Sequence, residues 1–212
     1  MTTLLFDWDG TIVDSMGALY EADAAICRHM GVPFDLDIFR RHYSPNWRLM
    51  YRNLGIPQER TDEAVAVWSA LFRSDRTRPF EGVQGALARL AAAGHTLGLV
   101  TSGDRRSVEP QLARIGVDEL IAVRVFGGDT IAGKPDPAPL LLALEMAGGA
   151  DPSDTIYVGD ALDDMRMAAA AGARGVGITS LVATAEELRA AGAAEAAGSV
   201  VEWAERLLSS PR

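Results

Sequence analysis

Five aspartates are the residues of this sequence whose type and spacing most clearly suggest chemistry. Asp7 and Asp9 stand close together near the start of the chain, and Asp160, Asp163 and Asp164 stand close together near its end. Clustered carboxylates repel one another by about 4 kcal/mol per close pair at an effective dielectric constant of about 20, so such a group needs a cation. Because all of these ligands are oxygen atoms, they favour a hard metal ion. A metal that keeps several waters and also binds oxygens of a substrate phosphate is more often Mg²⁺ than Ca²⁺.

A cation there would neutralise the charge on a phosphate group and let a carboxylate approach the phosphorus. Asp7 is the candidate nucleophile, which would form an aspartyl-phosphate that water later hydrolyses. Asp9 is the candidate acid and base, which would protonate the leaving alcohol and then activate the water. These residues predict chemistry on a phosphate ester.

Lys134 is the only lysine in the chain, and the other 19 basic residues are all arginine. A compact ammonium on a flexible stem acts as a point charge where a guanidinium fork would not fit. Because it lies in the run Gly133-Lys134-Pro135-Asp136-Pro137, we interpret it as part of the site rather than as an accidental surface lysine.

The elements that position these residues alternate between strand and helix. Apolar runs that end in polar or glycine-containing turns predict buried strands at residues 2–7, 96–100, 120–126 and 155–158. Apolar residues at helical spacing predict helices at residues 83–93, 107–115, 137–147 and 163–171. This alternation indicates an α/β fold, a Rossmann-like, doubly wound parallel sheet with helices on both faces.

Ligands of an open parallel sheet collect outside the carboxyl ends of its strands. Segments far apart in the sequence therefore converge on one edge of the predicted sheet. The residues delivered there are Asp7, Asp9, Thr101, Ser102, Lys134, Asp160, Asp163 and Asp164.

Residues 15–80 break the alternation, because they are helical in pattern and contain no convincing strand. We expect helices at residues 15–30, after Phe34, at 48–54 and at 59–74. The sequence thus predicts an all-helical cap domain of residues 15–80, inserted into a core domain of residues 1–14 and 81–212.

Charge and aromatic residues are distributed unevenly between these two parts. Residues 15–80 hold 9 arginines against 8 acidic residues and 9 of the 14 aromatic residues, whereas the rest holds 11 basic against 21 acidic residues. An aromatic, comparatively basic insert over an acidic core suggests a lid that offers cationic and stacking contacts to an anionic ligand. Packing of a small helical domain explains most of the aromatic residues equally well.

Four motifs, in this order along the chain, resemble those of the haloacid dehalogenase superfamily. Any one alone is weak, but all four in order, each after a predicted strand or its loop, are specific. The resemblance covers the whole chain, with residues 15–80 in the place of the family's helical cap. The motifs are Phe6-Asp7-Trp8-Asp9-Gly10-Thr11-Ile12-Val13-Asp14-Ser15, Leu97-Gly98-Leu99-Val100-Thr101-Ser102-Gly103, Gly133-Lys134-Pro135 and Val158-Gly159-Asp160-Ala161-Leu162-Asp163-Asp164.

The resemblance implies a phosphatase, nearest in appearance to the phosphoglycolate phosphatases, and a role for each matching residue. Asp7 would be the nucleophile and Asp9 the acid and base. The Asp7 carboxylate, the Asp9 backbone carbonyl and Asp160 would bind Mg²⁺, with Asp164 as a more distant or water-mediated partner, preferred to Asp163 for its spacing from Asp160. The phosphate would be held by Thr101 and Lys134 and by backbone N–H groups of Gly10, Ser102 and Gly103.

Differences from other members of the family narrow the choice of reaction. The dehalogenases lack an acid at the position of Asp9, which favours phosphate-ester chemistry over dehalogenation here. The phosphonate-cleaving members use a lysine of the cap, and they are excluded because this cap contains no lysine. Two alternatives stay open. One is a phosphosugar mutase, which returns the phosphoryl group to a second hydroxyl. The other is a non-catalytic module that senses a phosphorylated metabolite.

The turn at residues 44–48 occupies the place where relatives point a specificity loop into the site. We expect Arg48, with Asn46 and Arg52, to contact a distal anionic or polar group of the substrate. In the alternative, Trp47 is part of the cap core and Arg48 is solvated.

Bulk properties exclude several other classes of partner. A net charge of −9 argues against nucleic acid, because phosphate backbones are bound by basic surfaces. No tract is long and apolar enough to span a membrane, and residues 1–7 lack the pattern of a signal peptide. The single cysteine, Cys27, has no intrachain disulfide partner. We expect a cytoplasmic protein that acts on a small phosphate ester, and no pattern specifies an oligomeric state.

Overall fold

The computed structural model describes residues 2–72 and 77–209. In this part of the chain, six strands form one parallel sheet in the order β5-β4-β1-β6-β7-β8. The predicted doubly wound α/β fold is therefore confirmed. The strands are β1 (Thr3–Phe6), β4 (Thr96–Asp104), β5 (Ile121–Gly127), β6 (Thr155–Gly159), β7 (Arg174–Ile178) and β8 (Glu195–Ala197).

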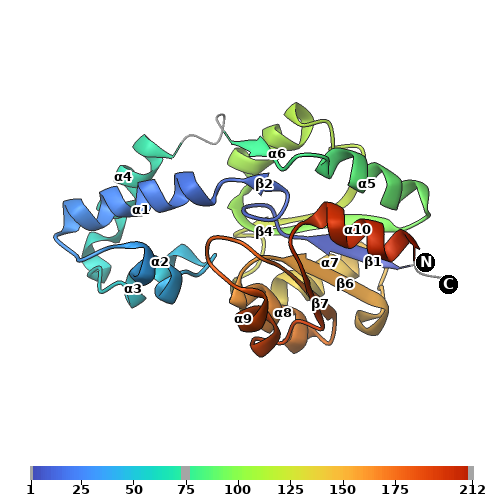
Figure 1. Ribbon diagram of the computed structural model, residues 1–212. Helices are drawn as coiled ribbons and strands as arrows, with labels where there is room; N and C mark the ends of the chain where they lie inside the picture. The colour runs from blue at the N-terminus through green and yellow to red at the C-terminus, as the bar shows by residue number, and fades with distance from the viewer. Residues whose placement is uncertain (1, 73–76, 210–212) are drawn as a thin grey trace.

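Successive side chains of β1 supply the cores on both faces of the sheet, which is why its sequence is a continuous apolar run. Leu4 and Phe6 belong to one buried cluster, and Leu5 belongs to the other. Helices α5 (Val83–Ala92), α6 (Arg105–Arg114) and α10 (Val200–Ser209) cover the first cluster. Helices α7 (Ala138–Met146), α8 (Leu162–Ala171) and α9 (Ala185–Ala190) cover the second, below the sheet in Figure 1.

The sequence predicted β1, β4, β5 and β6 but not β7 and β8. Strand β7 has the sequence Arg-Gly-Val-Gly-Ile, in which glycine interrupts the apolar run. A Cβ on Gly177 would lie 2.8 Å from the Cβ of Leu188, so close packing of α9 requires glycine there. Strand β8 has only 3 residues, too few to show a pattern.

Helices α1 (Met16–Met30), α2 (Leu36–His42), α3 (Trp47–Asn53) and α4 (Thr61–Leu71), with the short helix η1 (Gln58–Arg60), form the insert on the left of Figure 1. They have a buried cluster of their own around Phe39, whose ring lies within 6 Å of those of Tyr20, Phe34 and Tyr43. The predicted end of the last helix, residue 74, lies outside the described residues. The division into two domains stays a prediction.

Two short strands lie where the chain passes between the sheet and the insert. Strands β2 (Val13–Asp14) and β3 (Arg78–Pro79) pair antiparallel. The expectation that residues 15–80 contain no strand is thus wrong at Arg78–Pro79, since a two-residue strand carries no periodic signal. A short helix, η3 (Pro152–Asp154), precedes β6. No helix among the described residues has both the length and the hydropathy that crossing a membrane requires.

Candidate active site

Three carboxylates meet at the carboxyl ends of the central strands. Asp7 follows β1 directly, Asp160 follows β6, and Asp164 lies in the first turn of α8. Each aspartate offers one carboxylate oxygen, and these three oxygens all lie within 4.8 Å of one another. Asp7 is 4% exposed, Asp160 is 1% exposed and Asp164 is 0% exposed. The structure therefore brings together three of the five aspartates singled out in the sequence, at the edge predicted for ligand binding.

Lys134, in the loop between β5 and α7, joins two of these carboxylates. Its Nζ donates to Oδ1 of Asp7 at 2.6 Å and lies 2.8 Å from Oδ1 of Asp164. Burial alone lowers the pKa of this ammonium, but Asp164 and Asp7 outweigh that effect and raise the pKa above its ordinary value. The buried lysine therefore stays charged.

Asp164 is held on both of its oxygens. Oδ1 lies 3.0 Å from the hydroxyl of Tyr157, and Oδ2 accepts the backbone N–H of Ala161 at 3.0 Å. A Cβ on Gly159 would lie 2.5 Å from Oδ2, so only glycine leaves room for the carboxylate. The sequence reasoning missed Tyr157, because a tyrosine in a buried strand looks like a core residue, and its only signal is its place two residues before Gly159.

Asp160 presents both carboxylate oxygens to the site. In the described part of the chain, neither buried oxygen has a hydrogen-bond partner. Burial, then Asp164 and Asp7, raise the pKa of this group well above its usual value. Gly10 has a φ of 76°, and a Cβ there would lie 2.2 Å from Oδ2 of Asp160. Because the unpartnered oxygens face other carboxylates, these residues fit a hard divalent cation such as Mg²⁺.

Asp9 lies on the loop after β1 and is partly exposed. Burial raises the pKa of its carboxyl, opposed by a hydrogen bond from Ser15 and by the charge of Lys134. A raised pKa makes it easier for this carboxyl to hold a proton, which is what an acid catalyst requires. A Cβ on Gly103 would lie 3.9 Å from Oδ2 of Asp9, so the loop after β1 approaches β4 closely.

The predicted phosphate ligands lie at the end of β4 and after β1. Thr101 is buried, and its hydroxyl accepts the N–H of Gly103 at 3.0 Å, while Ser102 is half-buried. The N–H of Gly10 donates to the carbonyl of Val13 at 2.8 Å. Two of the predicted backbone donors are thus engaged within the protein. The role of all these residues toward a phosphate stays a prediction.

The three cap residues predicted to contact substrate lie in different surroundings, and Arg52 is exposed on α3. Asn46 caps α3 by accepting the N–H of Leu49 at 3.3 Å, and its Nδ2 lies 3.8 Å from where a Cβ of Gly133 would stand. Arg48 is exposed, with its guanidinium 4.2 Å from the centre of the Trp47 ring. The structure therefore places Asn46 beside the loop of Lys134 but leaves Arg48 at the surface.

Tyr43, at the C-terminal end of α2, is a cap residue that the sequence reasoning missed. The pKa of its phenol is raised well above the ordinary value. Burial is the largest cause, followed by the charges of Asp160, Asp7, Asp9 and Asp164. The phenol therefore stays a neutral hydrogen-bond donor, and Tyr43 lines a cavity together with Ser44 and Asp163. Its only signal in the sequence is its position directly before the turn at residues 44–48.

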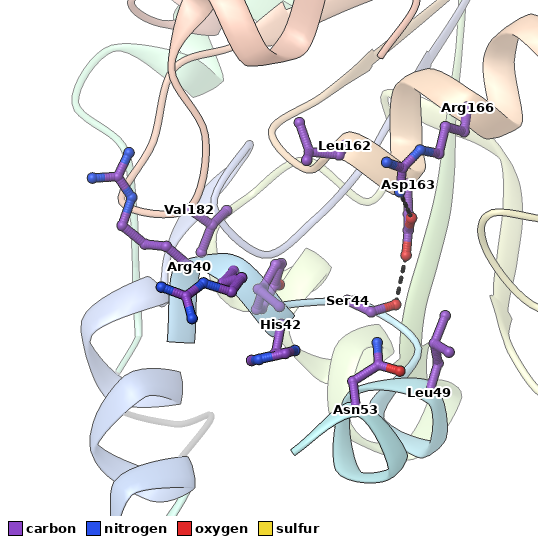
Figure 2. A pocket seen from close by; sticks show the side chains of 11 residues that line it. Arg40, His42, Ser44, Leu49, Asn53, Leu162, Asp163, Arg166 and Val182 are labelled. Atoms are coloured by element: carbon purple, nitrogen blue, oxygen red, sulfur yellow. Dashed lines mark hydrogen bonds and ion pairs between the residues drawn. The ribbon is translucent and has the colours of Figure 1, made fainter. Parts of the chain in front are cut away.

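A cavity of about 140 Å³ lies between the end of α2, the helix α3 and the start of α8, and Figure 2 shows the side chains that line it. Asp163 points toward Ser44 at the edge of this cavity, and Arg166 lies beside Asp163 on α8 and donates to its other oxygen. Asp163 therefore takes no part in the cluster of Asp7, Asp160 and Asp164.

Comparison with known proteins agrees with this geometry. Residues 4–178 match the family model described as haloacid dehalogenase-like hydrolase. The chain belongs to this family. The family predicted from the four motifs is thereby confirmed, and the chain is an enzyme of the hydrolase class.

Named relatives agree with the predicted phosphatase class. The haloacid dehalogenase-like chain is 33% identical over 192 residues to phosphoglycolate phosphatase 1 of Pseudomonas aeruginosa, covering 83% of this chain and 68% of the relative. It is 32% identical over 184 residues to a phosphoglycolate phosphatase of Yersinia pestis, covering 82% and 79%. A hydrolase structure from Pseudomonas syringae has a TM-score of 0.89 at 24% identity over 100% of both chains, which shows the shared fold.

Proposed function

We propose that this chain hydrolyses a small phosphomonoester, in a Mg²⁺-dependent reaction, through an aspartyl-phosphate on Asp7. The observation that carries the proposal is the buried group of Asp7, Asp160 and Asp164 around Lys134 at the carboxyl ends of the central strands. Buried carboxylates with two unpartnered oxygens are costly unless a ligand uses them.

The carboxylates of Asp7 and Asp160 and the backbone carbonyl of Asp9 would hold Mg²⁺. When bound, the ion supplies positive charge that screens the phosphate from the nucleophile. Asp164 is already engaged by Tyr157, Ala161 and Lys134. We assign Asp164 to orienting the lysine and to contacts made through water.

The remaining chemistry belongs to the side chains of this chain. Lys134 donates a hydrogen bond to Oδ1 of Asp7, which leaves Oδ2 of Asp7 as the oxygen that attacks the phosphorus. A bond forms between that oxygen and phosphorus while the bond from phosphorus to the ester oxygen breaks, and Asp9 gives its proton to the leaving alcohol. A water molecule then gives a proton to Asp9 and attacks the phosphorus, which releases inorganic phosphate and restores Asp7.

The ester we propose to test first is 2-phosphoglycolate, because curated relatives over most of this chain are named for that substrate. We further propose that the enzyme works in the cytoplasm on free small molecules.

Phosphate release from a panel of esters tests this proposal, measured with Mg²⁺ and with EDTA. The panel contains 2-phosphoglycolate, hexose phosphates and p-nitrophenyl phosphate, with Asp7→Asn as the blank. We expect Mg²⁺-dependent release from at least one ester and none in the blank. Transfer of the phosphoryl group between sugar hydroxyls without release would instead support the mutase, and binding of an ester without turnover would support the sensing module.

A further inference from the structure

A short hydrogen bond joins the helical insert to the core next to the candidate active site. The hydroxyl of Ser44 donates to Oδ2 of Asp163 at 2.6 Å, across 119 positions of sequence. Both residues are buried, at 4% and 5% exposure. Figure 2 shows this contact at the edge of the cavity, with Ser44 on the insert and Asp163 on α8.

Each end of this hydrogen bond is fixed by a second contact. Oδ1 of Asp163 accepts from Arg166 at 2.9 Å, one turn further along α8. The hydroxyl oxygen of Ser44 accepts the N–H of Asn46 at 3.2 Å. The contact therefore connects the first turn of α8, which carries Asp164, to the turn that begins α3.

The residues near Ser44 lie beside the candidate site. Tyr43 comes directly before Ser44 and lines the same cavity, and the charges of Asp160, Asp7 and Asp9 help to raise the pKa of its phenol. Asn46 follows two positions later and lies beside Gly133, next to Lys134. The hydrogen bond thus holds a short segment whose neighbours carry neutral hydrogen-bond donors toward the carboxylates.

We propose that the Ser44–Asp163 hydrogen bond positions Tyr43 and Asn46 over the active site, where these two residues contact the part of the substrate beyond its phosphate. The inference rests on the proposed function. A phenol and an amide suit a small oxygen-rich group, such as a carboxylate or a hydroxyl, better than an apolar one. Ser44 and Asp163 are positioning residues in this account, because they act through Tyr43 and Asn46.

Kinetics on two esters test the positioning. In Ser44→Ala and Asp163→Ala, kcat/KM for 2-phosphoglycolate should fall about tenfold, mainly because KM rises. A factor of about ten is what the loss of one hydrogen bond of ordinary net strength represents. The loss should be smaller for p-nitrophenyl phosphate, whose leaving group has no carboxylate or hydroxyl. Asp163→Asn should recover most of the loss, since its amide oxygen still accepts from Ser44. Ser153→Ala, which removes an exposed hydrogen bond to Asp151, is the matched control and should have no effect.

Hydrogen exchange tests the contact without any substrate. In Ser44→Ala, amides of α3 and of the first turn of α8 should exchange faster than in the wild type, whereas those of β1 should not change. If these amides exchanged faster but the ratio of kcat/KM between the two esters stayed at its wild-type value, the positioning role would be overturned. If the exchange rates did not change, the whole inference would be overturned. If the wild type released no phosphate from any ester, the proposed function would fail, while faster exchange in Ser44→Ala would still support the contact.

Discussion

Lys134 is a buried cation between Asp7 and Asp164, and its positive charge offsets part of the repulsion among the carboxylates of the site. Asp7, Asp160 and Lys134 stand in short motifs, so the sequence could predict that they meet. Tyr43 could not be predicted in the same way, because a single aromatic residue in a helical insert looks like a packing residue. Its place near the carboxylates depends on how the insert sits on the core, which no local pattern specifies.

Replacement of Lys134 by methionine tests the charge balance of the site. The substitution Lys134→Met leaves Asp7 and Asp164 buried without their cation, and removal of one partner from a buried ion pair costs about 3–5 kcal/mol. We expect a loss of that order in the free energy of unfolding, measured with urea, and loss of phosphate release. Arg174→Met, which breaks an exposed pair with Glu195, should cost less than about 1 kcal/mol. Equal effects of the two substitutions would contradict this account.

The stability of the metal-free protein should depend on pH through Asp7. Burial is the main cause that raises the pKa of this carboxyl from 3.8 to about 7 in the folded protein. Between these values the folded chain binds more protons than the unfolded chain, so stability falls as pH rises. In EDTA, the unfolding free energy of the wild type should fall relative to that of Asp7→Asn between about pH 4 and pH 7, by at most about 1.4 kcal/mol per pH unit. A pH-independent difference would show that Asp7 ionises normally.

At the scale of elements, the strands and helices around the motifs were predicted to within a few residues, and the strand ends position the site as expected. The misses have physical causes. Strand β7 contains two glycines, of which Gly177 is needed for contact with α9. The pair β2 and β3 has two residues in each strand, so its pairing depends on two segments far apart in the sequence that tertiary structure brings together.

The turn after β1 can be tested through Gly10. The substitution Gly10→Ala places a Cβ 2.2 Å from Oδ2 of Asp160 at a φ of 76°. Gly116→Ala is a matched control, because its φ is 70° but no atom of the described residues lies within 4 Å of the added Cβ. Both should lose about 1–2 kcal/mol from left-handed backbone. Only Gly10→Ala should lose further stability and the stabilisation by Mg²⁺ in thermal unfolding. Retention of the Mg²⁺ effect in Gly10→Ala would show that Asp160 is not a ligand.

At the scale of the whole molecule, an acidic core carries the reactive carboxylates and a helical insert with its own buried cluster lies beside them. The insert contacts the core through Val182, which follows β7 and joins the cluster around Phe39. The sequence predicted the insert from its helical pattern and its charge. It could not predict the Ser44–Asp163 contact, since nothing local relates residues 119 positions apart.

The division into two domains predicts local unfolding of the insert. Phe39 is fully buried at the centre of its cluster, and replacing a buried phenylalanine by alanine costs about 3–5 kcal/mol. In Phe39→Ala, amides of α1 and α4 should exchange faster by hydrogen exchange, while those of β1, β4 and β6 keep their protection. Equal loss of protection in both sets would mean that insert and core unfold as one unit.

The central claim is that Asp7 forms a covalent bond to phosphorus. Rapid acid quenching of the enzyme during turnover of its best ester with Mg²⁺, followed by peptide mass spectrometry, measures this directly. We expect a phosphoryl group on the peptide that contains Asp7, removed by hydroxylamine and absent in Asp7→Asn, which releases no phosphate. Sustained phosphate release by Asp7→Asn, with no modified peptide in the wild type, would contradict it.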